Sequence, residues 1–393
     1  MTMSGKRQHY LPQFHQRRFG IEPRNKKTQV WRLDKKSGKP ERVDPSGEAV
    51  IDHYYSVTLE DGTVVDHADN VLGRFESDAA PVIERIVKDP GYRVTGSDVQ
   101  ALLLYIVTLK NRTPRAREGL RESDERANEL LFEAMLSDQA RYHRTMAKHD
   151  GSPEELESTR LKLLADLRAG EIVVESEPDR EVAMMLIAVE GTARKLFEEI
   201  GVRCLRVPAE SKAVFVTSDH PVAHYDPTPK TPESGVSFMS SPGAVTVVAV
   251  DPRLALLLVQ DHPQRWADEV IGEDDVDEAN LLTYAWARSA IYGPSQFAVT
   301  RVRALAKGNH KLLGKFRYRP PRVWIGRGGD PSKGGPVEFS SRFKDQMATR
   351  TFHVAPDSMA DESRGVWPPD EDTSDGSSKP AAAEEQAVSG DDR

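Results

Sequence analysis

The chain has 393 residues, of which 38% are hydrophobic and 30% charged, and its formal net charge is −8 at pH 7. This length provides a sizeable core, while the negative charge disfavours non-specific binding of the whole protein to nucleic acid or to a membrane surface. The single cysteine, Cys204, excludes an internal disulfide framework and a cysteine-based zinc site. The longest apolar run is too short to span a bilayer, and the start of the chain lacks a signal-peptide core, so we expect a cytoplasmic protein that does not enter a membrane.

The first sixty residues are predicted to form an N-terminal arm and a hairpin. Aromatic and basic side chains interleave between residues 6 and 20, and the spacing of Tyr10 and Phe14 suits one face of a short helix. A strand is expected at 28–34, with a turn and a second strand after it, and residues 52–57 are expected to be extended. The apolar side chains of the arm are too costly to leave in water, so we expect the arm to pack near residues 217–221.

Helical periodicity dominates the next segment, residues 66–200. Ser97 and Gln100 suggest a capping box for a helix that Arg112-Thr-Pro114 interrupts. One long helix is expected over 115–148, and Ser152-Pro-Glu-Glu155 has the N-cap and first-turn proline of another helix start. Further helices are expected at about 66–86 and 179–200.

Strands are predicted at 202–207, 213–217, 245–250 and 254–259, with a hairpin turn at Asp251-Pro-Arg. A core helix follows at 276–291, and the loop at 224–243 is expected to be mobile. Together these elements predict an α+β protein with a mostly helical body and a small antiparallel sheet. We expect one globular domain over 1–326, made of the N-terminal arm and hairpin (6–60), the helical block (66–200) and the strands with the final core helix (202–325). Residues 327–393 have too few apolar side chains to fold and predict a disordered acidic tail.

The central motif is Thr217-Ser-Asp-His-Pro221, where an expected strand runs from apolar into polar residues. Side chains alternate along a strand, so Ser218 and His220 share one face and Asp219 lies on the other. These three neighbours therefore do not form a catalytic triad among themselves. Asp219 requires partners from elsewhere in the chain.

Two residues are candidates for catalysis. His9 has the chemistry of a general base or a metal ligand, and the alternative is a histidine that anchors the N-terminal arm. Asp219 could ligate a divalent metal such as Mg²⁺ or orient a histidine, and the alternative is a turn-forming residue before a proline. Glu76 is a second candidate metal ligand, although a solvated helix face also explains it.

Five further residues are candidates for substrate binding: Tyr10, Arg112, Ser218, Asn280 and Arg288. Asn280 and Arg288 are eight residues apart on the expected last helix and so share a face. Arg288 could bind a phosphate, or it could form a structural ion pair with Asp219. Arg112 presents the same choice, and Ser218 lacks the glycine-flanked turn of a nucleophilic serine.

Signals for nucleic acid are present but weak. Glu210-Ser-Lys212 resembles the E-x-K tripeptide of some metal-dependent nucleases, in which the carboxylate binds the metal. Basic residues cluster at 6–36 and at 307–322, where aromatic residues interleave with them, as phosphate and base-stacking contacts require. A solvated basic surface that balances the acidic tail explains the same pattern.

Several separate stretches agree in order with one known family. They are QHYLPQFHQRRF at 8–19, VWRLDKKSGK at 30–39, DHYYSV at 52–57, RFESDAAPVIERI at 74–86, NRTPRAR at 111–117, FVTSDHPV at 215–222 and NLLTYAWARSAIY at 280–292. Over residues 6–295 the chain resembles the bacterial domain-of-unknown-function family 4238, with its His-Tyr-x-Pro opening and central Thr-Ser-Asp-x-Pro. The resemblance implies no assigned activity. His220 departs from the pattern expected there, and the long inserted helix around 120–170 and the acidic tail are peculiar to this chain.

Two functional hypotheses follow. In the first, His9, Asp219, Asn280 and Arg288 form a site that acts on a nucleic acid or another phosphate-containing ligand, as in a metal-dependent phosphodiesterase or nuclease. In the second, the protein is a non-catalytic binding or interaction module, and the same residues form a buried polar network that fixes the N-terminal arm to the sheet. Exposure of the carboxylates and the histidine distinguishes the two.

Overall fold

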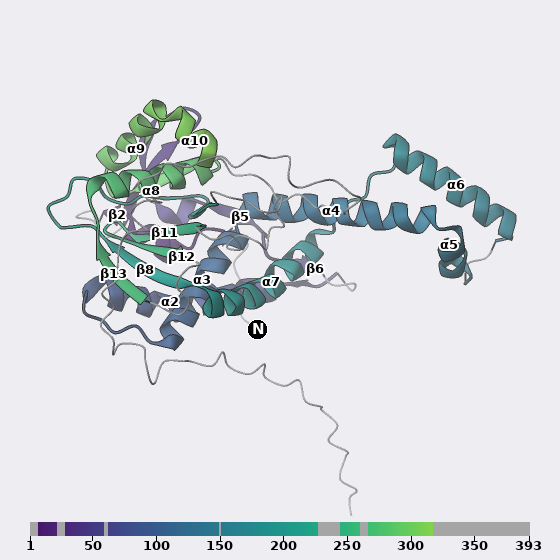
Figure 1. The fold of residues 1–393 in the computed structure, drawn as a ribbon, viewed down its shortest axis with the longest axis horizontal. Helices are drawn as coiled ribbons and strands as arrows, with labels where there is room; N and C mark the ends of the chain where they lie inside the picture. Colours follow the sequence, from purple (N-terminus) through teal and green to yellow (C-terminus); the bar gives the residue numbers. More distant parts are fainter. Residues whose placement is uncertain are drawn as a thin grey trace, which may run out of the picture.

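A computed structural model describes residues 7–21, 28–58, 62–148, 151–226, 244–259 and 266–316 (Figure 1). The predicted tail at 327–393 and most of the predicted mobile loop, residues 227–243, lie outside the described residues. Within them, helices and mainly antiparallel sheets occupy largely separate parts of the chain, which confirms the α+β class. The mostly helical character is also confirmed, but there is more than one sheet.

The central sheet has five strands in the order β10-β11-β12-β8-β13. These are β8 (Gly201–Arg206), β10 (Val222–Tyr225), β11 (Val245–Asp251), β12 (Leu254–Val259) and β13 (Trp266–Val270). All neighbours are antiparallel except β13, which runs parallel to β8. The apolar runs of β8, β11 and β12 are buried at nearly every position because both faces of this sheet are covered. The hairpin between β11 and β12 was predicted and is confirmed.

A second five-stranded sheet lies beside the polar motif. Four of its strands follow the order β2-β3-β14-β9. The fifth strand, β4, pairs with β3 and forms a hairpin with it. The strands are β2 (Gly20–Ile21), β3 (Gln29–Asp34), β4 (Pro40–Val43), β9 (Thr217–Ser218) and β14 (Ala290–Gly293). The N-terminal part also contains two small two-stranded sheets and a 3-10 turn. One sheet pairs β1 (Arg7–His9) with β5 (Val50–Asp52), the other pairs β6 (Val57–Thr58) with β7 (Val64–Val65), and the turn is η1 (Pro45–Gly47). The hairpin predicted after residue 28 is therefore confirmed.

Three local predictions are wrong. The strand expected at 213–217 shrinks to β9, because the amide of Val216 donates to the side chain of Asn280 rather than to a neighbouring strand. The core helix expected at 276–291 ends at Trp286, and Ile291 belongs to β14. The extended segment expected at 52–57 contains a turn, in which His53 has a positive φ of 53°.

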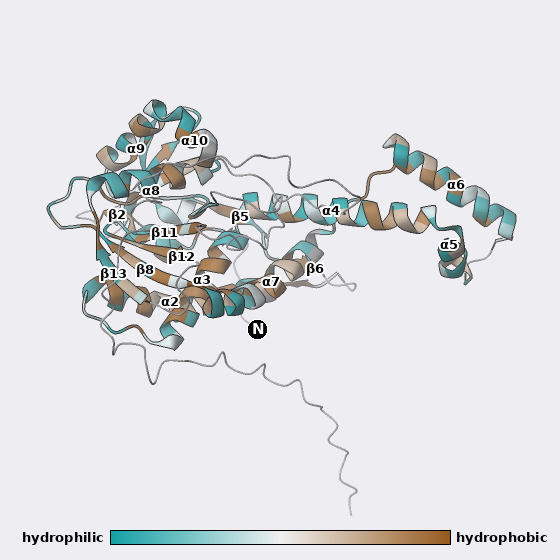
Figure 2. Cartoon of the chain, viewed as in Figure 1, coloured by the Kyte–Doolittle hydropathy of each residue, from teal (hydrophilic) through white to brown (hydrophobic). Residues whose placement is uncertain are grey.

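Helices cover the sheets on two sides. In Figure 1, α2 (His67–Lys88), α3 (Gly96–Asn111) and α7 (Pro178–Glu199) are drawn below the central sheet, and α8 (Glu273–Trp286), α9 (Gln296–Gly308) and α10 (His310–Phe316) above it. The short α1 (Gln13–Arg18) contacts β11. Brown apolar residues concentrate in α3 and the central strands (Figure 2). The capping box of α3 is formed by Thr95 and Asp98, not by the predicted Ser97 and Gln100.

A helical arm projects from this body. It consists of the distal part of α4 (Pro114–Ser137), α5 (Gln139–Met146) and α6 (Pro153–Ala169) (Figure 1). The helix predicted over 115–148 is thus two helices, because Asp138 ends α4 and caps α5 by accepting a hydrogen bond from the Arg141 amide. The predicted start of α6 is confirmed by a capping box between Ser152 and Glu155.

The body and the arm have separate hydrophobic clusters. The main cluster joins buried residues from Leu11 to Phe316. The arm has its own small cluster around Leu136, Tyr142 and Leu167. Among the described residues, no helix combines the length and the apolar character needed to cross a membrane.

Candidate functional site

The N-terminal segment packs on the body, as predicted. Phe19 is fully buried, and Tyr10 and Phe14 are half-buried against the main cluster. The ring of Phe14 lies 5.3 Å from that of Tyr105, measured between centroids. Burial of these side chains stabilises the position of β1 and α1 against the body.

His15 connects this segment to the central motif. Its Nδ1 lies 2.9 Å from the Tyr105 hydroxyl and its Nε2 lies 3.0 Å from Oγ1 of Thr217. Complete burial, with a smaller contribution from nearby arginines, lowers the pKa of His15 to about 3. The imidazole is therefore neutral and structural at pH 7. His15 was not among the residues predicted from the sequence, although it lies four residues from the apolar Leu11 and from the apolar Phe19, which was a signal that it faces the same side of the segment.

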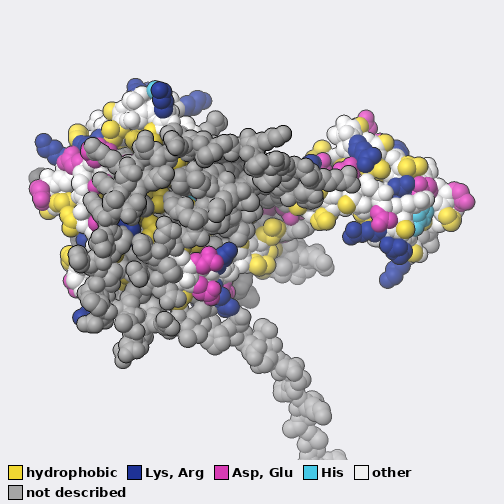
Figure 3. Space-filling view, viewed as in Figure 1, with side chains coloured by type: hydrophobic (Ala, Val, Ile, Leu, Met, Phe, Trp, Pro, Cys, Tyr) yellow, Lys and Arg dark blue, Asp and Glu magenta, His cyan; other side chains and the backbone are white. Residues whose placement is uncertain are grey.

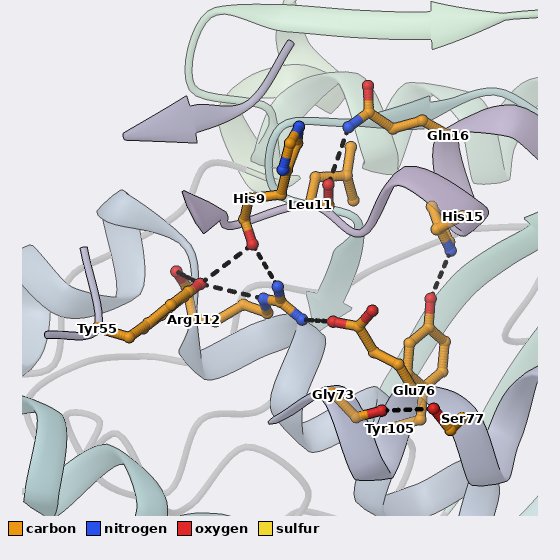
Figure 4. Close-up of polar contacts among 10 residues, drawn as sticks. All are labelled: His9, Leu11, His15, Gln16, Tyr55, Gly73, Glu76, Ser77, Tyr105 and Arg112. Carbon is orange, nitrogen blue, oxygen red and sulfur yellow. Dashed lines mark hydrogen bonds and ion pairs between the residues drawn. The ribbon is translucent and has the colours of Figure 1, made fainter. Parts of the chain in front are cut away.

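Arg112 is the centre of a buried polar group (Figure 4). It is 2% exposed, follows the last residue of α3, and donates to the main-chain oxygen of His9, to Glu76 and to the Tyr55 hydroxyl. Burial opposes the charged guanidinium, but Tyr55 and Glu76 outweigh it and raise the pKa of Arg112. Arg112 and Glu76, predicted as a substrate-binding residue and a metal ligand, are thus partners in one ion pair that holds β1 against α2 and α3.

The side chain of His9 remains half-exposed at the edge of this group. Its Nε2 lies 3.3 Å from the main-chain oxygen of Ser46 and 3.3 Å from Nε2 of Gln13. Partial burial lowers the pKa of His9, although the contact with Ser46 acts in the opposite direction. His9 is the predicted catalytic residue whose ring keeps access to solvent, and its neutral form has the chemistry of a proton acceptor.

Asp219 fixes the turn between α8 and β14. Its Oδ1 accepts from the amide of Arg288 (2.8 Å), and its Oδ2 accepts from the amide of Ser289 (2.7 Å), the Ser289 hydroxyl (2.6 Å) and the amide of Ala290 (3.1 Å). The residue is 2% exposed. Both carboxylate oxygens are therefore occupied by donors from one three-residue stretch.

The expected ion pair between Asp219 and the Arg288 side chain is not formed. Only the amide of Arg288 bonds to Asp219, whereas its guanidinium pairs with Glu118 of α4 at 2.6 Å. The Arg288 and Glu118 side chains are 49% and 42% exposed. Arg288 thus contributes a backbone group to the interior and a charge to the surface.

The remaining motif residues make short-range contacts. The Ser218 hydroxyl donates to the main-chain oxygen of His220, 2.7 Å away, and accepts from the His220 amide. The His220 ring stacks on Trp286 and lies 2.6 Å from Oγ1 of Thr113. Asn280 accepts from the Val216 amide and donates to the main-chain oxygen of Val214, so it substitutes for a neighbouring strand.

Lys35 is a site residue that was not predicted from the sequence. Its Nζ donates to the main-chain oxygens of Tyr284 and Ala287, at 2.7 and 2.5 Å, and so caps the C-terminus of α8. Its amide donates to the main-chain oxygen of Ser289. Burial lowers the pKa of Lys35 to about 8, while the charge of Asp219 raises it. In the sequence Lys35 is indistinguishable from a solvated turn lysine, because its partners lie about 250 residues away.

The two expected metal ligands belong to different groups. Glu76 is held by Arg112, and Asp219 by the 288–290 turn. In the part of the chain that the structure describes, no three His, Cys, Asp or Glu side chains are grouped so that they could hold a metal ion. Glu210 of the nuclease-like tripeptide is exposed, and the amide of Lys212 donates to Glu273.

Tyr10 is influenced by both groups, because the charge of Asp219 and Tyr55 of the Arg112 group act on its hydroxyl. Its amide donates to the main-chain oxygen of Ala49, and its ring centroid is 6.2 Å from that of Tyr54. Burial and, secondarily, the negative charge of Asp219 raise the pKa of Tyr10. The predicted residues are therefore brought together at the junction of the N-terminal segment, the α3–α4 corner and the α8–β14 turn, with most of their polar atoms bonded to one another or to the backbone.

Comparison with known proteins gives one match. No curated protein and no solved structure matches the chain. A family described as "Protein of unknown function (DUF4238)" matches residues 7–297, which include β1, the central motif and β14. The chain therefore belongs to the DUF4238 family.

Proposed function

We propose that this protein is a non-catalytic binding or interaction module, in which the motif residues lock the N-terminal segment and the α8–β14 turn onto the sheets. The proposal rests on one observation: the Asp219 carboxylate accepts four hydrogen bonds from residues 288–290 and is 2% exposed. Hydrogen bonds from backbone amides to a charged carboxylate are stronger than neutral ones, so they hold this turn firmly in place. We retain a single globular domain over 1–326 and a cytoplasmic location as parts of this proposal.

The energetics of that turn disfavour a metal-binding role for Asp219. A metal ion bound to Asp219 would displace the donors of residues 288–290 from the carboxylate, and a buried donor left without an acceptor costs about 1–3 kcal/mol. The Ala290 main-chain oxygen also accepts from the Asp219 amide, so the two segments are tied in both directions. The same carboxylate is well suited to holding a turn and poorly suited to exchanging ligands.

The test combines stability with hydrolysis. Asp219→Asn replaces one acceptor oxygen by a donor that faces backbone amides, so we expect a lower free energy of unfolding and no effect on any hydrolytic activity beyond loss of folded protein. The measurements are thermal unfolding and cleavage of single-stranded DNA and of bis(p-nitrophenyl) phosphate with Mg²⁺. Glu118→Gln, at the exposed pair beside the turn, is the control and should unfold like the wild type. A cleavage activity that Asp219→Asn abolishes without loss of stability would overturn the proposal.

A second candidate is the phosphodiesterase or nuclease hypothesis, acting on a nucleic acid or another phosphate-containing ligand, with Mg²⁺ as its expected cofactor. One observation favours it: His9 has a half-exposed ring whose pKa is lowered by burial, so the ring is neutral at pH 7. A neutral imidazole could accept a proton, and the exposed Arg288 guanidinium could bind a phosphate. His9→Asn should then abolish cleavage while leaving stability nearly unchanged, since the Arg112 contact is made to the His9 backbone.

A further inference from the structure

Among the described residues, one face of α6 in the arm is exposed and is not covered by the body. The inward side of α6 packs on the arm cluster through Leu167, with Leu156, Leu163 and Leu164 partly buried against it. Arg160 is also buried on this side and donates to the main-chain oxygen of Leu136. The orientation of α6 on α4 and α5 is thereby fixed, so its opposite face is a defined surface.

That opposite face carries a regular stripe. Five exposed residues lie along it, separated by alternating steps of four and three residues. They are Glu154, Ser158, Leu161, Ala165 and Arg168. Alternating four- and three-residue steps place them along one line of the helix, as on the contact seam of a coiled coil. Leu161 is 52% exposed at the centre of this stripe. Figure 3 shows apolar, acidic and basic side chains interleaved on the arm.

The stripe is complementary to itself. Leu161 is the midpoint of α6, with eight residues on either side, and Glu154 and Arg168 are each seven residues from it. Seven residues are two helical turns, so an acidic end, a leucine and a basic end lie in line. When two such helices are antiparallel about a two-fold axis, Leu161 meets Leu161 of the second copy and Glu154 faces Arg168 of the second copy. Ser158 and Ala165 lie roughly opposite each other and are small enough for close approach.

We propose that α6 is a self-association surface whose occupant is a second copy of this chain, packed antiparallel along the stripe defined by residues 154, 158, 161, 165 and 168. This inference concerns the arm alone and does not depend on the function proposed for the body. The symmetry creates two Glu154–Arg168 pairs across the interface and removes both exposed leucines from water.

The intramolecular partner of Arg168 does not oppose this arrangement. Arg168 pairs with Glu133 at 2.9 Å, but the two side chains are 59% and 38% exposed. Such surface pairs contribute about 0–1 kcal/mol, so Arg168 can change or share its partner at little cost. A contact along one helix of about 25 Å buries less area than the ~1,200 Å² of a stable complex, so the dimer is weak and concentration-dependent.

Sedimentation equilibrium of the full chain over a wide concentration range tests the proposal. The wild type should show a reversible monomer–dimer equilibrium, and Leu161→Asp should remove it. Ile187→Asp is the matched control, because Ile187 is a 77% exposed apolar residue on α7, outside the arm. A wild type that stays monomeric throughout, or a control that weakens the dimer as much as Leu161→Asp, would overturn the proposal.

Charge reversal tests the antiparallel geometry. Glu154→Arg alone and Arg168→Glu alone each create two like-charged pairs in a homodimer, so each should weaken dimerisation by about tenfold or more. A mixture of the two variants should form a heterodimer near wild-type strength, because each cross-pair then joins an arginine to a glutamate. Far-ultraviolet circular dichroism verifies that both variants are folded. Failure of the mixture to recover dimerisation would contradict the antiparallel packing.

Discussion

The strands β8, β11 and β12 of the body are buried along nearly their whole length, whereas α4, whose distal part belongs to the arm, has three buried residues among its 24. The body cluster runs from Leu11 to Phe316 and includes residues from both sheets, while the arm depends on a few side chains around Tyr142. The hydrogen bonds and ion pairs of the two parts also differ. In the body, Arg112, His15 and Asp219 make buried or partly buried hydrogen bonds to segments about 70 to 200 residues away, whereas on the arm most polar contacts join residues within four positions. The body should therefore unfold as one unit, and the arm should open locally.

The largest effect is expected from Arg112 in the body. Arg112→Met leaves the Glu76 carboxylate and the main-chain oxygen of His9 without their shared donor, and breaking a buried pair costs about 3–5 kcal/mol. Chemical denaturation should show this loss for the whole body. The double change Arg112→Met with Glu76→Met should recover part of it, because no unpaired charge remains. A double variant no more stable than the single one would show that the two residues are not coupled.

Leu136 tests whether the arm opens independently of the body. It is fully buried in the arm cluster, and Leu136→Ala should cost about 2–5 kcal/mol of local stability. We expect faster hydrogen exchange in α5 and α6 while the main thermal transition of the body stays in place. A uniform fall of the main transition would mean that arm and body unfold together, and the comparison would fail.

The pH dependence of body stability follows from His15. Its pKa is about 3 in the folded protein, below the ordinary 6.5, so folding favours the neutral form. Stability is complete above pH 6.5 and falls as the pH drops below that value, because only the unfolded chain gains the proton. Between pH 6.5 and pH 5 this loss is about 2 kcal/mol for one such histidine. His15→Gln should therefore lose about 2 kcal/mol less stability than the wild type between pH 6.5 and pH 5, as measured by chemical denaturation at each pH. His220 has the same direction of pKa shift and leaves a residual slope.

The smallest effect is expected at Arg288. Arg288→Met removes the exposed pair with Glu118 but retains the amide that bonds to Asp219, so stability should change by less than about 0.5 kcal/mol. Equilibrium denaturation measures this difference. A loss of several kcal/mol would mean that the guanidinium, not the backbone, is the partner of Asp219.

The elements that sequence could predict are those whose signals are local. The run of apolar residues at 254–259 gave the bounds of β12, and Ser152 with Glu155 marked the start of α6, because each pattern lies within a few residues. The strand expected at 213–217 failed because Asn280, more than sixty residues away, supplies the hydrogen bonds that a neighbouring strand would provide. The prediction that the last core helix reaches residue 291 was wrong for a similar reason. The helix ends at Trp286 because Asp219, about seventy residues away, holds the turn that follows it.

The contacts of the predicted site residues could not be derived from the sequence. Arg112 donates to the main-chain oxygen of His9, and Asp219 accepts from the amides of residues 288–290. Their roles depend on partners about 60 to 100 residues distant, such as the 288–290 amides and the main-chain oxygen of His9, which composition and spacing do not encode. Lys35 was missed because its partners are the carbonyls of a helix end.

The most direct test of the account is native-state hydrogen exchange at the amides of Arg288, Ser289 and Ala290, followed by NMR in the wild type and in Asp219→Asn. The acceptor for all three amides is the buried Asp219 carboxylate, so each amide is protected as long as the turn stays bonded to it. We therefore predict slow exchange at all three amides in the wild type, slowest at Ala290 whose bond to Asp219 is buried, and a clear loss of protection in the variant. Fast exchange at residues 288–290 in the wild type would show that the Asp219 carboxylate is free for other chemistry and would contradict the structural role proposed for it.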